Sequence, residues 1–131
     1  MFRPRRILVP VDLSSDTEAA VRAAAGLARD NGARLLLLHV FDVRAVEDVY
    51  NLHGLKKEEV LARPWLKGTK TTVKGVFGLP SEVIVAEAKA WKADLIVLAK
   101  RRRSGLSHLL YGRTSDGVVR EAECAVLVLT P

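Results

Sequence analysis

Residues 98–130 read LAKRRRSGLSHLLYGRTSDGVVREAECAVLVLT, and this stretch decides the fold. An apolar segment ends at Leu98, a basic run follows at 100–103, and the glycine at 112 precedes hydroxyl residues that can begin a helix. A second apolar segment occupies 125–129. In open α/β sheets, anions and nucleotides bind outside the carboxyl ends of the strands, at the N-terminus of a helix. The stretch therefore predicts an anion or nucleotide site.

Five short apolar segments along the chain predict β-strands. In most of them nearly every residue is apolar, which is typical of strands buried on both faces of a parallel sheet. One segment is instead rich in Thr and Val, which also favour strands. The segments are Ile7–Val11, Leu35–Phe41, Thr71–Phe77, Leu95–Leu98 and Ala125–Leu129.

Helical patterns separate these strands. A capping motif opens an Ala-rich helix at about 15–30, and a proline opens a second helix at 80–91. The last helix is predicted at 114–121, after the glycine. The segment 42–70 is polar and weakly patterned, with a candidate short helix at Lys56–Leu61.

Strands that alternate with helices form right-handed crossovers, so the sheet is predicted to be parallel. We therefore expect an α/β fold, a single layer sandwich with a five-stranded parallel sheet of flavodoxin-like or Rossmann-like type. The first and fourth strands should flank a crevice where the strand order reverses. Asp12 follows the first strand, and Ala99 precedes the basic run after the fourth.

The length and composition indicate the class of protein. A chain of 131 residues predicts one domain over 1–131, with 49% hydrophobic residues and 27% charged ones. No apolar run approaches the roughly 20 residues that span a membrane, and Ile7–Val11 is too short for a signal peptide. Because Cys124 is the single cysteine, an internal disulfide is excluded. These features predict a cytoplasmic protein without membrane contact.

The positive charge is concentrated in two places. The net charge is +6, and seven of the 21 basic residues lie at Arg3, Arg5, Arg6 and 100–103. The other 14 are nearly balanced by 15 acidic residues. A local basic run favours an anionic ligand or partner. No nucleic-acid-binding motif is present, so we expect only nonspecific, salt-sensitive contact between the run at 100–103 and polyanions.

Several short motifs, taken in order, resemble the universal stress protein family, and the similarity covers nearly the whole chain. The motifs are Pro10-Val11-Asp12, Leu38-His39-Val40, Ser104-Gly105-Leu106-Ser107, Gly112 and Glu123-Cys124-Ala125-Val126-Leu127-Val128. The resemblance implies an adenine nucleotide alpha hydrolase-like fold, stress or metabolic signalling in the cytosol, and a homodimer.

Some members of that family bind ATP, and the resemblance extends to part of their site. They place the Asp after the first strand near the adenosine, which corresponds to Asp12 here. Val40 matches a position on the adenine side. Their phosphate loop has the form G-x-x-G-x9-G-[ST]. The corresponding residues of this chain are Ala99, Arg102, Gly112 and Arg113.

Only Gly112 of this loop motif matches, and the departures have physical consequences. Ala99 closes the positive-φ region that glycine allows. Arg102 and Arg113 place long cations where the family has a glycine and a hydroxyl. Two alternatives follow: the arginines grip phosphate through their side chains, or they fill the pocket. The neighbouring hydroxyls of Thr114 and Ser115 are expected to donate from the helix N-terminus.

The candidate residues for a nucleotide or phosphate are Pro10, Val11, Asp12, Val40, Ala99, Arg102, Gly112, Arg113, Thr114 and Ser115. No nucleophile elbow or Walker loop occurs, and the histidines and cysteine lack metal-ligand spacing, so neither catalytic residues nor a metal are predicted. The sequence favours a binding and signalling protein, with ATP or another adenine nucleotide as the candidate ligand. The alternatives are a nucleotide-free adaptor dimer that acts through partner proteins, and a weak nucleotide hydrolase.

The segment Ala125–Leu129 is predicted to end the sheet and to form the dimer. It is apolar throughout and follows the last helix. An open apolar edge is normally covered, and pairing with a two-fold mate would cover this one.

Overall fold

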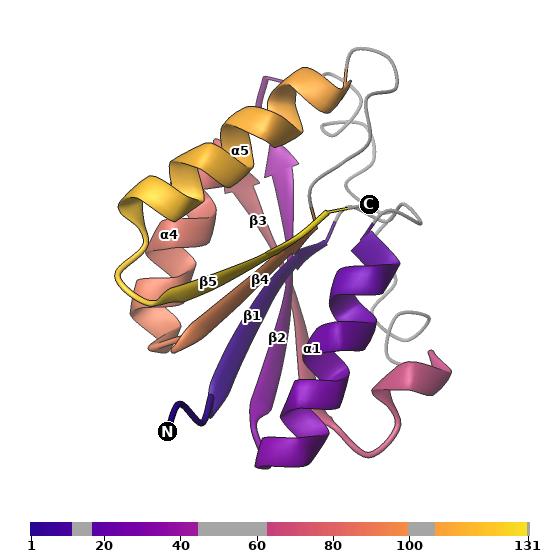
Figure 1. Cartoon of the computed structure of the whole chain (residues 1–131). Coiled ribbons are helices and arrows are strands. Elements are labelled where there is room, and N and C mark those ends of the chain that lie inside the picture. The colour runs from indigo at the N-terminus through magenta and orange to yellow at the C-terminus, as the bar shows by residue number, and fades with distance from the viewer. Residues whose placement is uncertain (12–16, 45–62, 100–106, 131) are drawn as a thin grey trace.

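A single parallel sheet organises the chain, with strand order β3-β2-β1-β4-β5. The computed structural model describes residues 1–11, 17–44, 63–99 and 107–130, and of 107–113 it describes the backbone alone. The strands are β1 (Arg6–Val11), β2 (Arg34–Asp42), β3 (Lys70–Gly78), β4 (Leu95–Ala99) and β5 (Ala125–Leu129). The predicted five-stranded α/β fold is therefore confirmed (Figure 1).

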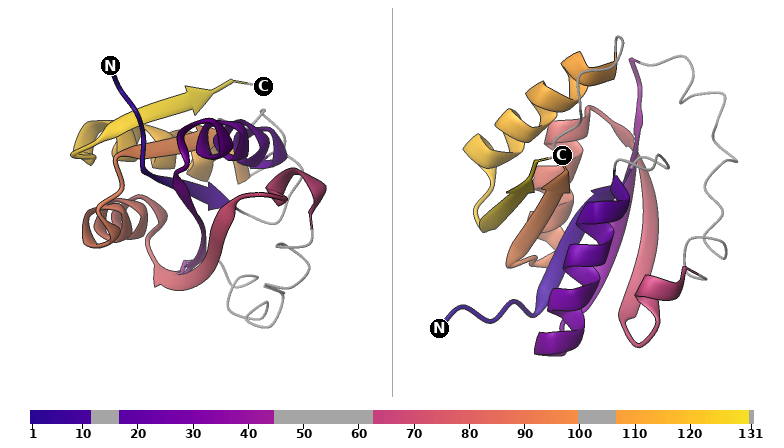
Figure 2. Two further views of the ribbon diagram at one scale, coloured as in Figure 1. Left: turned by 90° about the horizontal axis from the view of Figure 1, so that it is seen from below. Right: turned by 45° about the vertical axis from the view of Figure 1, so that its right-hand side comes forward.

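Helices cover both faces of the sheet. Helix α1 (Glu18–Asn31) packs on one face, while α4 (Pro80–Trp91) and α5 (Ser107–Glu121) pack on the other (Figures 1 and 2). A short 3-10 helix, η2 (Pro64–Leu66), docks on α1, where Arg29 Nη1 donates to the Trp65 carbonyl at 2.7 Å. In the described part of the chain, no helix has the length and apolar character needed to cross a membrane.

The alternation of strand side chains divides the core into two layers. Leu35 and Leu37 point towards α1 and pack with its alanines, whereas Leu36 and Leu38 pack with residues of α4 and α5. Successive residues of a strand face opposite sides, so a strand buried on both faces must be apolar at nearly every position. This requirement explains the continuous apolar runs that predict the strands.

The end of α1 follows from one glycine. Gly32 adopts φ 64° and ψ 30°, a left-handed conformation, and its N–H bonds to the carbonyl of Ala28. Glycine adopts this conformation without steric cost because it has no Cβ. The left-handed residue ends the helix. The helix begins at Glu18 with Thr17 at the N-cap, about one turn later than the capping motif predicts, and Ser15 and Asp16 lie outside the described residues. The candidate helix Lys56–Leu61 also lies outside them.

The predicted start of the last helix is wrong. The sequence analysis places it at Thr114, after Gly112, but α5 begins at Ser107. Both Gly112 and Arg113 are therefore helical. A glycine inside a helix costs only about 1 kcal/mol relative to alanine, and the leucines before it favour the helix, so the glycine does not mark a boundary.

Helices α4 and α5 approach closely at a second glycine of α5. A Cβ atom built on Gly117 would lie 2.9 Å from Ser81 Cβ and 3.1 Å from Ser81 Oγ. Because Ser81 Cβ is attached directly to the α4 backbone, the clash cannot be relieved by a side-chain rotation. The absence of a side chain at Gly117 therefore sets the distance between the two helices.

Replacing Gly117 with Ala should lower the free energy of unfolding by about 1–2 kcal/mol, because overpacking outweighs the gain in helix propensity. The matched control is Gly26→Ala in α1, where an added Cβ meets nothing within 4 Å. That variant should raise the free energy of unfolding by about 0.5–1 kcal/mol. Chemical denaturation measures both, and equal effects at the two positions would contradict the steric explanation.

Candidate nucleotide or anion site

Hydrogen-bonded pairing between β1 and β4 stops before their carboxyl ends. Their ladder contains only the pairs Ile7–Leu95 and Leu8–Ile96, although β1 continues to Val11 and β4 to Ala99. On its other side, β1 pairs with β2 along its whole length. We call the unpaired carboxyl ends of β1 and β4 the opening; the strand order reverses between these two strands, as predicted. This is the position at which open α/β sheets bind ligands.

Pro10 explains why the ladder ends. The Arg6 carbonyl accepts from Asp94 N, just before β4, whereas the Arg5 carbonyl accepts from Arg34 N of β2. Since the peptide groups of a strand alternate in direction, even-numbered residues of β1 direct their N–H and C=O groups towards β4. Pro10 has no N–H, so the donor that would continue the β1–β4 ladder is missing.

His39 anchors the last residue of β1. Its Nδ1 lies 3.0 Å from the Val11 carbonyl oxygen, and since a carbonyl only accepts, Nδ1 carries the hydrogen. The ring is 7% exposed and packs edge-on against Phe41, with 4.5 Å between ring centroids. His39 is therefore a buried residue with a hydrogen-bonded ring, and its bond holds the backbone immediately before Asp12. The sequence reveals the buried ring, but not its hydrogen bond to a carbonyl of the neighbouring strand.

The described candidate residues lie on both sides of this opening. Pro10 and Val11 end β1, and Ala99 ends β4, all half-buried. Val11 and Ala99 pack with the core layer of α1, whereas Val40 packs with the layer of α4 and α5. Asp12 and Arg102 lie outside the described residues, and only the backbone of Gly112 and Arg113 is described.

The structure corrects the positions of the two hydroxyl residues. Thr114 and Ser115 were expected at the N-terminus of the last helix, but they lie about two turns inside α5. Their backbone N–H groups are therefore not among the first four of the helix, which are the free donors. Only their side-chain hydroxyls can act towards a ligand.

Of the two hydroxyl residues, Ser115 is the buried one. Its side chain is 6% exposed, and in the described part of the chain no hydrogen bond involves its hydroxyl. It lies three residues before Val118, which belongs to the core layer of α4 and α5, so it faces the sheet. Buried hydroxyls are normally paired. The Ser115 hydroxyl is therefore an unused donor and acceptor among the described candidate residues.

At Ala99 the backbone does not need a glycine. In the described residues, Lys92 is the one non-glycine residue with a positive φ, so Ala99 is extended and pairs with Leu129 of β5. A phosphate loop that begins with glycine uses that residue to bring backbone N–H groups close to the anion. Here the strand continues through this position.

Asp42 is a charged residue at the same edge that sequence reasoning missed. Its side chain is 6% exposed and accepts from Arg44 three times: Oδ1 from N at 2.9 Å and from Nε at 3.0 Å, and Oδ2 from Nη2 at 2.9 Å. Hydrogen bonding to the Arg44 side chain holds the pKa of Asp42 below its ordinary value. The sequence pattern that indicates this ion pair is an Asp at the end of a strand with a basic residue two positions later.

The variant Asp42→Asn should lower the free energy of unfolding by about 1 kcal/mol at pH 7. Because the folded pKa of Asp42 lies below the unfolded value of about 3.9, its charge stabilises the fold above that pH, and this contribution is lost as the pH falls through the folded pKa. Denaturation at pH 7 and pH 3 should show the difference between variant and parent shrinking at pH 3. The control Glu18→Gln removes an exposed ion pair and should change stability by less than about 0.5 kcal/mol. A pH-independent effect of Asp42→Asn would contradict the assignment.

Comparisons with known proteins identify the family and agree with the observed fold. A model of the universal stress protein family matches residues 4–130. The chain is 32% identical to a putative universal stress protein of Staphylococcus epidermidis, over 98% of this chain and 86% of the relative. The structure of universal stress protein UspA from Lactobacillus plantarum superposes with a TM-score of 0.82 at 26% identity, covering 98% and 99% of the two chains. A universal stress protein in complex with cAMP has a TM-score of 0.77 at 20% identity, covering 98% of each chain.

Proposed function

Because the chain belongs to the universal stress protein family, we propose that it is a cytoplasmic, single-domain binding and signalling protein with a divergent site for an adenine nucleotide or a phosphate anion. The observation that carries this proposal is the opening between β1 and β4, which Pro10 creates by removing a ladder donor. The unpaired hydroxyl of Ser115 provides independent support, since it lies in the described core without a hydrogen bond.

The ligand class comes from the family resemblance and from one structural neighbour. The Asp after the first strand is present as Asp12, and Val40 lies in β2 at the expected position. The neighbour with cAMP shares the fold alone at 20% identity, so it identifies the class of ligand to test first and not its contacts. Adenine nucleotides are accordingly the first probes.

Of the two roles for the arginines, we favour the pocket-filling one. Two glycines and a hydroxyl of the loop motif are replaced together, by Ala99, Arg102 and Arg113. The extended backbone at Ala99 leaves the strand intact where a glycine loop would approach phosphate. A site that retained phosphate binding through backbone N–H groups would need the conformational freedom of a glycine at this position. Binding by the natural protein should therefore be weak.

The double variant Arg102→Gly/Arg113→Ser separates the two roles by the sign of its effect. If the arginines fill the pocket, ATP should bind about tenfold or more tightly to the variant. ATP then no longer has to displace the arginine side chains, which costs about 1.4 kcal/mol of binding free energy. If they grip phosphate, each lost charge-assisted bond is worth about 1.5–3 kcal/mol and affinity should fall. Isothermal titration calorimetry measures both.

Two further variants make this titration specific. Arg120→Ser removes an exposed arginine from the last turn of α5, so it controls for net charge and should leave affinity unchanged. Ser115→Ala, placed in the double variant, should weaken ATP binding several-fold, as expected for one hydrogen bond. No binding of ATP, other adenine nucleotides or phosphate by any of these proteins would refute the proposed site.

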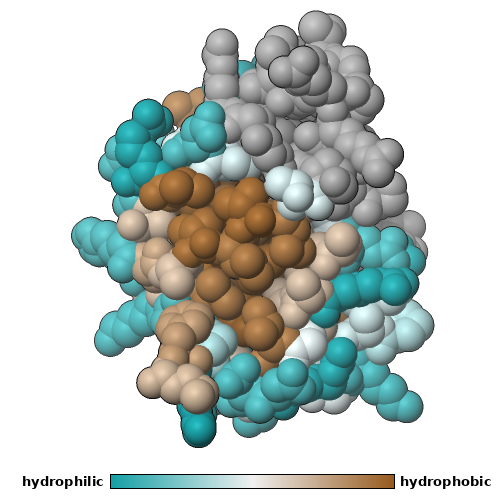
Figure 3. Space-filling model, viewed as in Figure 1, coloured by the Kyte–Doolittle hydropathy of each residue, from teal (hydrophilic) through white to brown (hydrophobic). Residues whose placement is uncertain are grey.

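The second candidate function is an adaptor dimer, and the edge of the sheet favours it. Strand β5 pairs with β4 alone. Val126 and Val128 pack against the core layer of α4 and α5, whereas Leu127 on the other side is 38% exposed. Figure 3 shows a broad apolar area on the face that β5 crosses in Figure 1. We propose that a second copy of the chain covers this edge, with or without nucleotide.

The variant Leu127→Glu should convert the proposed dimer into a monomer, because it places a charge on the apolar edge without disturbing the core. Substitutions at Val126 and Val128 are unsuitable, since both residues pack inward. Phe77→Glu is the matched control: Phe77 is 46% exposed on the opposite edge strand, β3, and its replacement should leave the dimer intact. Sedimentation velocity measures the mass. A monomeric parent protein at micromolar concentration would refute the dimer.

A further inference from the structure

Three cations stand side by side at the N-terminal ends of neighbouring strands. Arg6 of β1 is in register with Arg34 of β2, and Arg34 is in register with Lys70 of β3. Arg6 and Arg34 precede Leu8 and Leu36 of the α4 and α5 core layer by two residues, and Lys70 precedes Lys74, which pairs with Glu87 of α4, by four, so all three project from that same face. We call these three residues the basic row. Neither basic run of the sequence reveals it, because Arg34 and Lys70 are isolated in the chain.

The arrangement is electrostatically unfavourable by itself. Neighbouring strands lie about 4.8 Å apart, and like charges directly opposite each other destabilise a sheet. Arg34 and Lys70 are exposed, and in the described part of the chain neither forms an ion pair. Lys74, four residues further along β3, is neutralised by Glu87 at 2.8 Å. The fold thus pairs Lys74 with an acid but leaves Arg34 and Lys70 without one.

The surroundings add positive charge. Four more exposed cations lie near the N-terminal ends of the strands or in the turns that lead into them: Arg3, Arg5, Lys67 and Lys92. Asp94 lies at this edge too, but its carboxylate accepts from the backbone N–H groups of Arg5 and Arg6. Hydrophilic residues form the lower rim of Figure 3, below the apolar area.

Arg6 is also fixed in place. Its Nη1 donates to the Trp91 carbonyl at 3.0 Å, and its guanidinium carbon lies 5.7 Å from the centroid of the Trp91 ring. A cation held by backbone and ring contacts loses little freedom when it meets an anion. The row is therefore partly preorganised.

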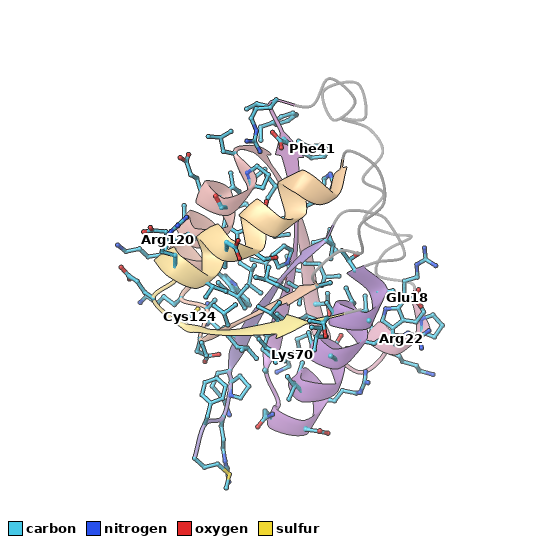
Figure 4. The ribbon with its side chains drawn as sticks, turned by 45° about the horizontal axis from the view of Figure 1, so that its top comes forward. Glu18, Arg22, Phe41, Lys70, Arg120 and Cys124 are labelled. Carbon is cyan, nitrogen blue, oxygen red and sulfur yellow. The ribbon has the colours of Figure 1, made fainter. Side chains whose placement is uncertain are left out.

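The basic row is distant from the nucleotide site. It lies at the N-terminal ends of the strands, whereas the opening between β1 and β4 lies at their carboxyl ends. The nine residues of β2 separate the two ends by about 25 Å. In Figure 4, Phe41 and Lys70 mark the two ends of the sheet. A ligand on the row leaves the nucleotide site accessible.

We propose that the basic row binds the sugar–phosphate backbone of nucleic acid without sequence preference. Closely spaced cations without aromatic or apolar side chains between them match a line of phosphates, which are contacted through charge alone. A protein partner would need apolar anchors at the centre of its interface. The row itself contains none, and the exposed apolar side chains of Met1 and Phe2 belong to the segment before β1. Three cations alone would bind an anionic membrane only weakly.

The test is the salt dependence of binding to a 30-base-pair duplex, measured by fluorescence anisotropy between 50 and 200 mM salt. Each phosphate contact contributes about −0.9 to the slope of log affinity against log salt, so Arg34→Gln/Lys70→Gln should reduce the slope by about 2 units. Two duplexes of unrelated sequence should bind the parent protein equally.

Matched variants separate the row from general charge. Arg22→Gln/Arg120→Gln removes the same charge from the outer surfaces of α1 and α5 and should leave the slope nearly unchanged (Figure 4). Arg101→Gln/Arg103→Gln tests the other basic run. A fall in slope for the row variant, with or without one for this loop variant, supports the proposal. An unchanged slope for the row variant, or an equal fall for the α1 and α5 control, overturns it.

Two further measurements keep the result interpretable. The melting temperature of Arg34→Gln/Lys70→Gln should stay the same or rise, because like-charge repulsion is relieved. Vesicles containing anionic lipid provide the membrane arm, and binding to these vesicles without binding to the duplex would overturn the proposal. Since nucleotide titration is performed separately, failure at the row does not affect the proposed nucleotide site.

Discussion

The Asp94 carboxylate holds the junction on which the rest of the sheet depends. Its oxygens accept from Arg5 N at 2.8 and 3.1 Å and from Arg6 N at 3.2 Å, while its own N–H donates to the Arg6 carbonyl at 3.0 Å. These bonds join β1 to the start of β4, next to the two ladder pairs of these strands. Hydrogen bonding between the half made of β3, β2 and β1 and the half made of β4 and β5 is therefore concentrated at one end, while side chains of both halves share the two core layers.

The β1–β4 junction is hydrogen-bonded at one end and unpaired at the other. Pro10 removes the donor that would continue the ladder, so pairing stops before the carboxyl ends of the two strands. His39 holds the end of β1 on the β2 side, because its ring bonds to the Val11 carbonyl. Asp12 follows directly in the chain after this held residue. These three local constraints act at the place where we propose the ligand site.

Charge is distributed along the same axis. The run at 100–103 follows β4 directly, at the carboxyl end of the sheet, whereas Arg3, Arg5 and Arg6 lie at the opposite end. Of the two runs, the structure describes the one at the N-terminal ends of the strands. At this end of the sheet, strand register adds Arg34 and Lys70 to the run, so the charge there is greater than the sequence suggests.

The sequence by itself determined the strands and their parallel arrangement, because burial on both faces requires apolar residues at nearly every strand position. The reversal of strand order between β1 and β4 also followed from it. Only the tertiary structure decided where α5 begins, since local propensity and packing extend the helix through Gly112 to Ser107. The His39 bond to Val11, the unpaired hydroxyl of Ser115 and the in-register basic row likewise depend on neighbours distant in the chain. Such contacts leave no periodic signal, because strand register and helix packing, rather than residue spacing, bring them together.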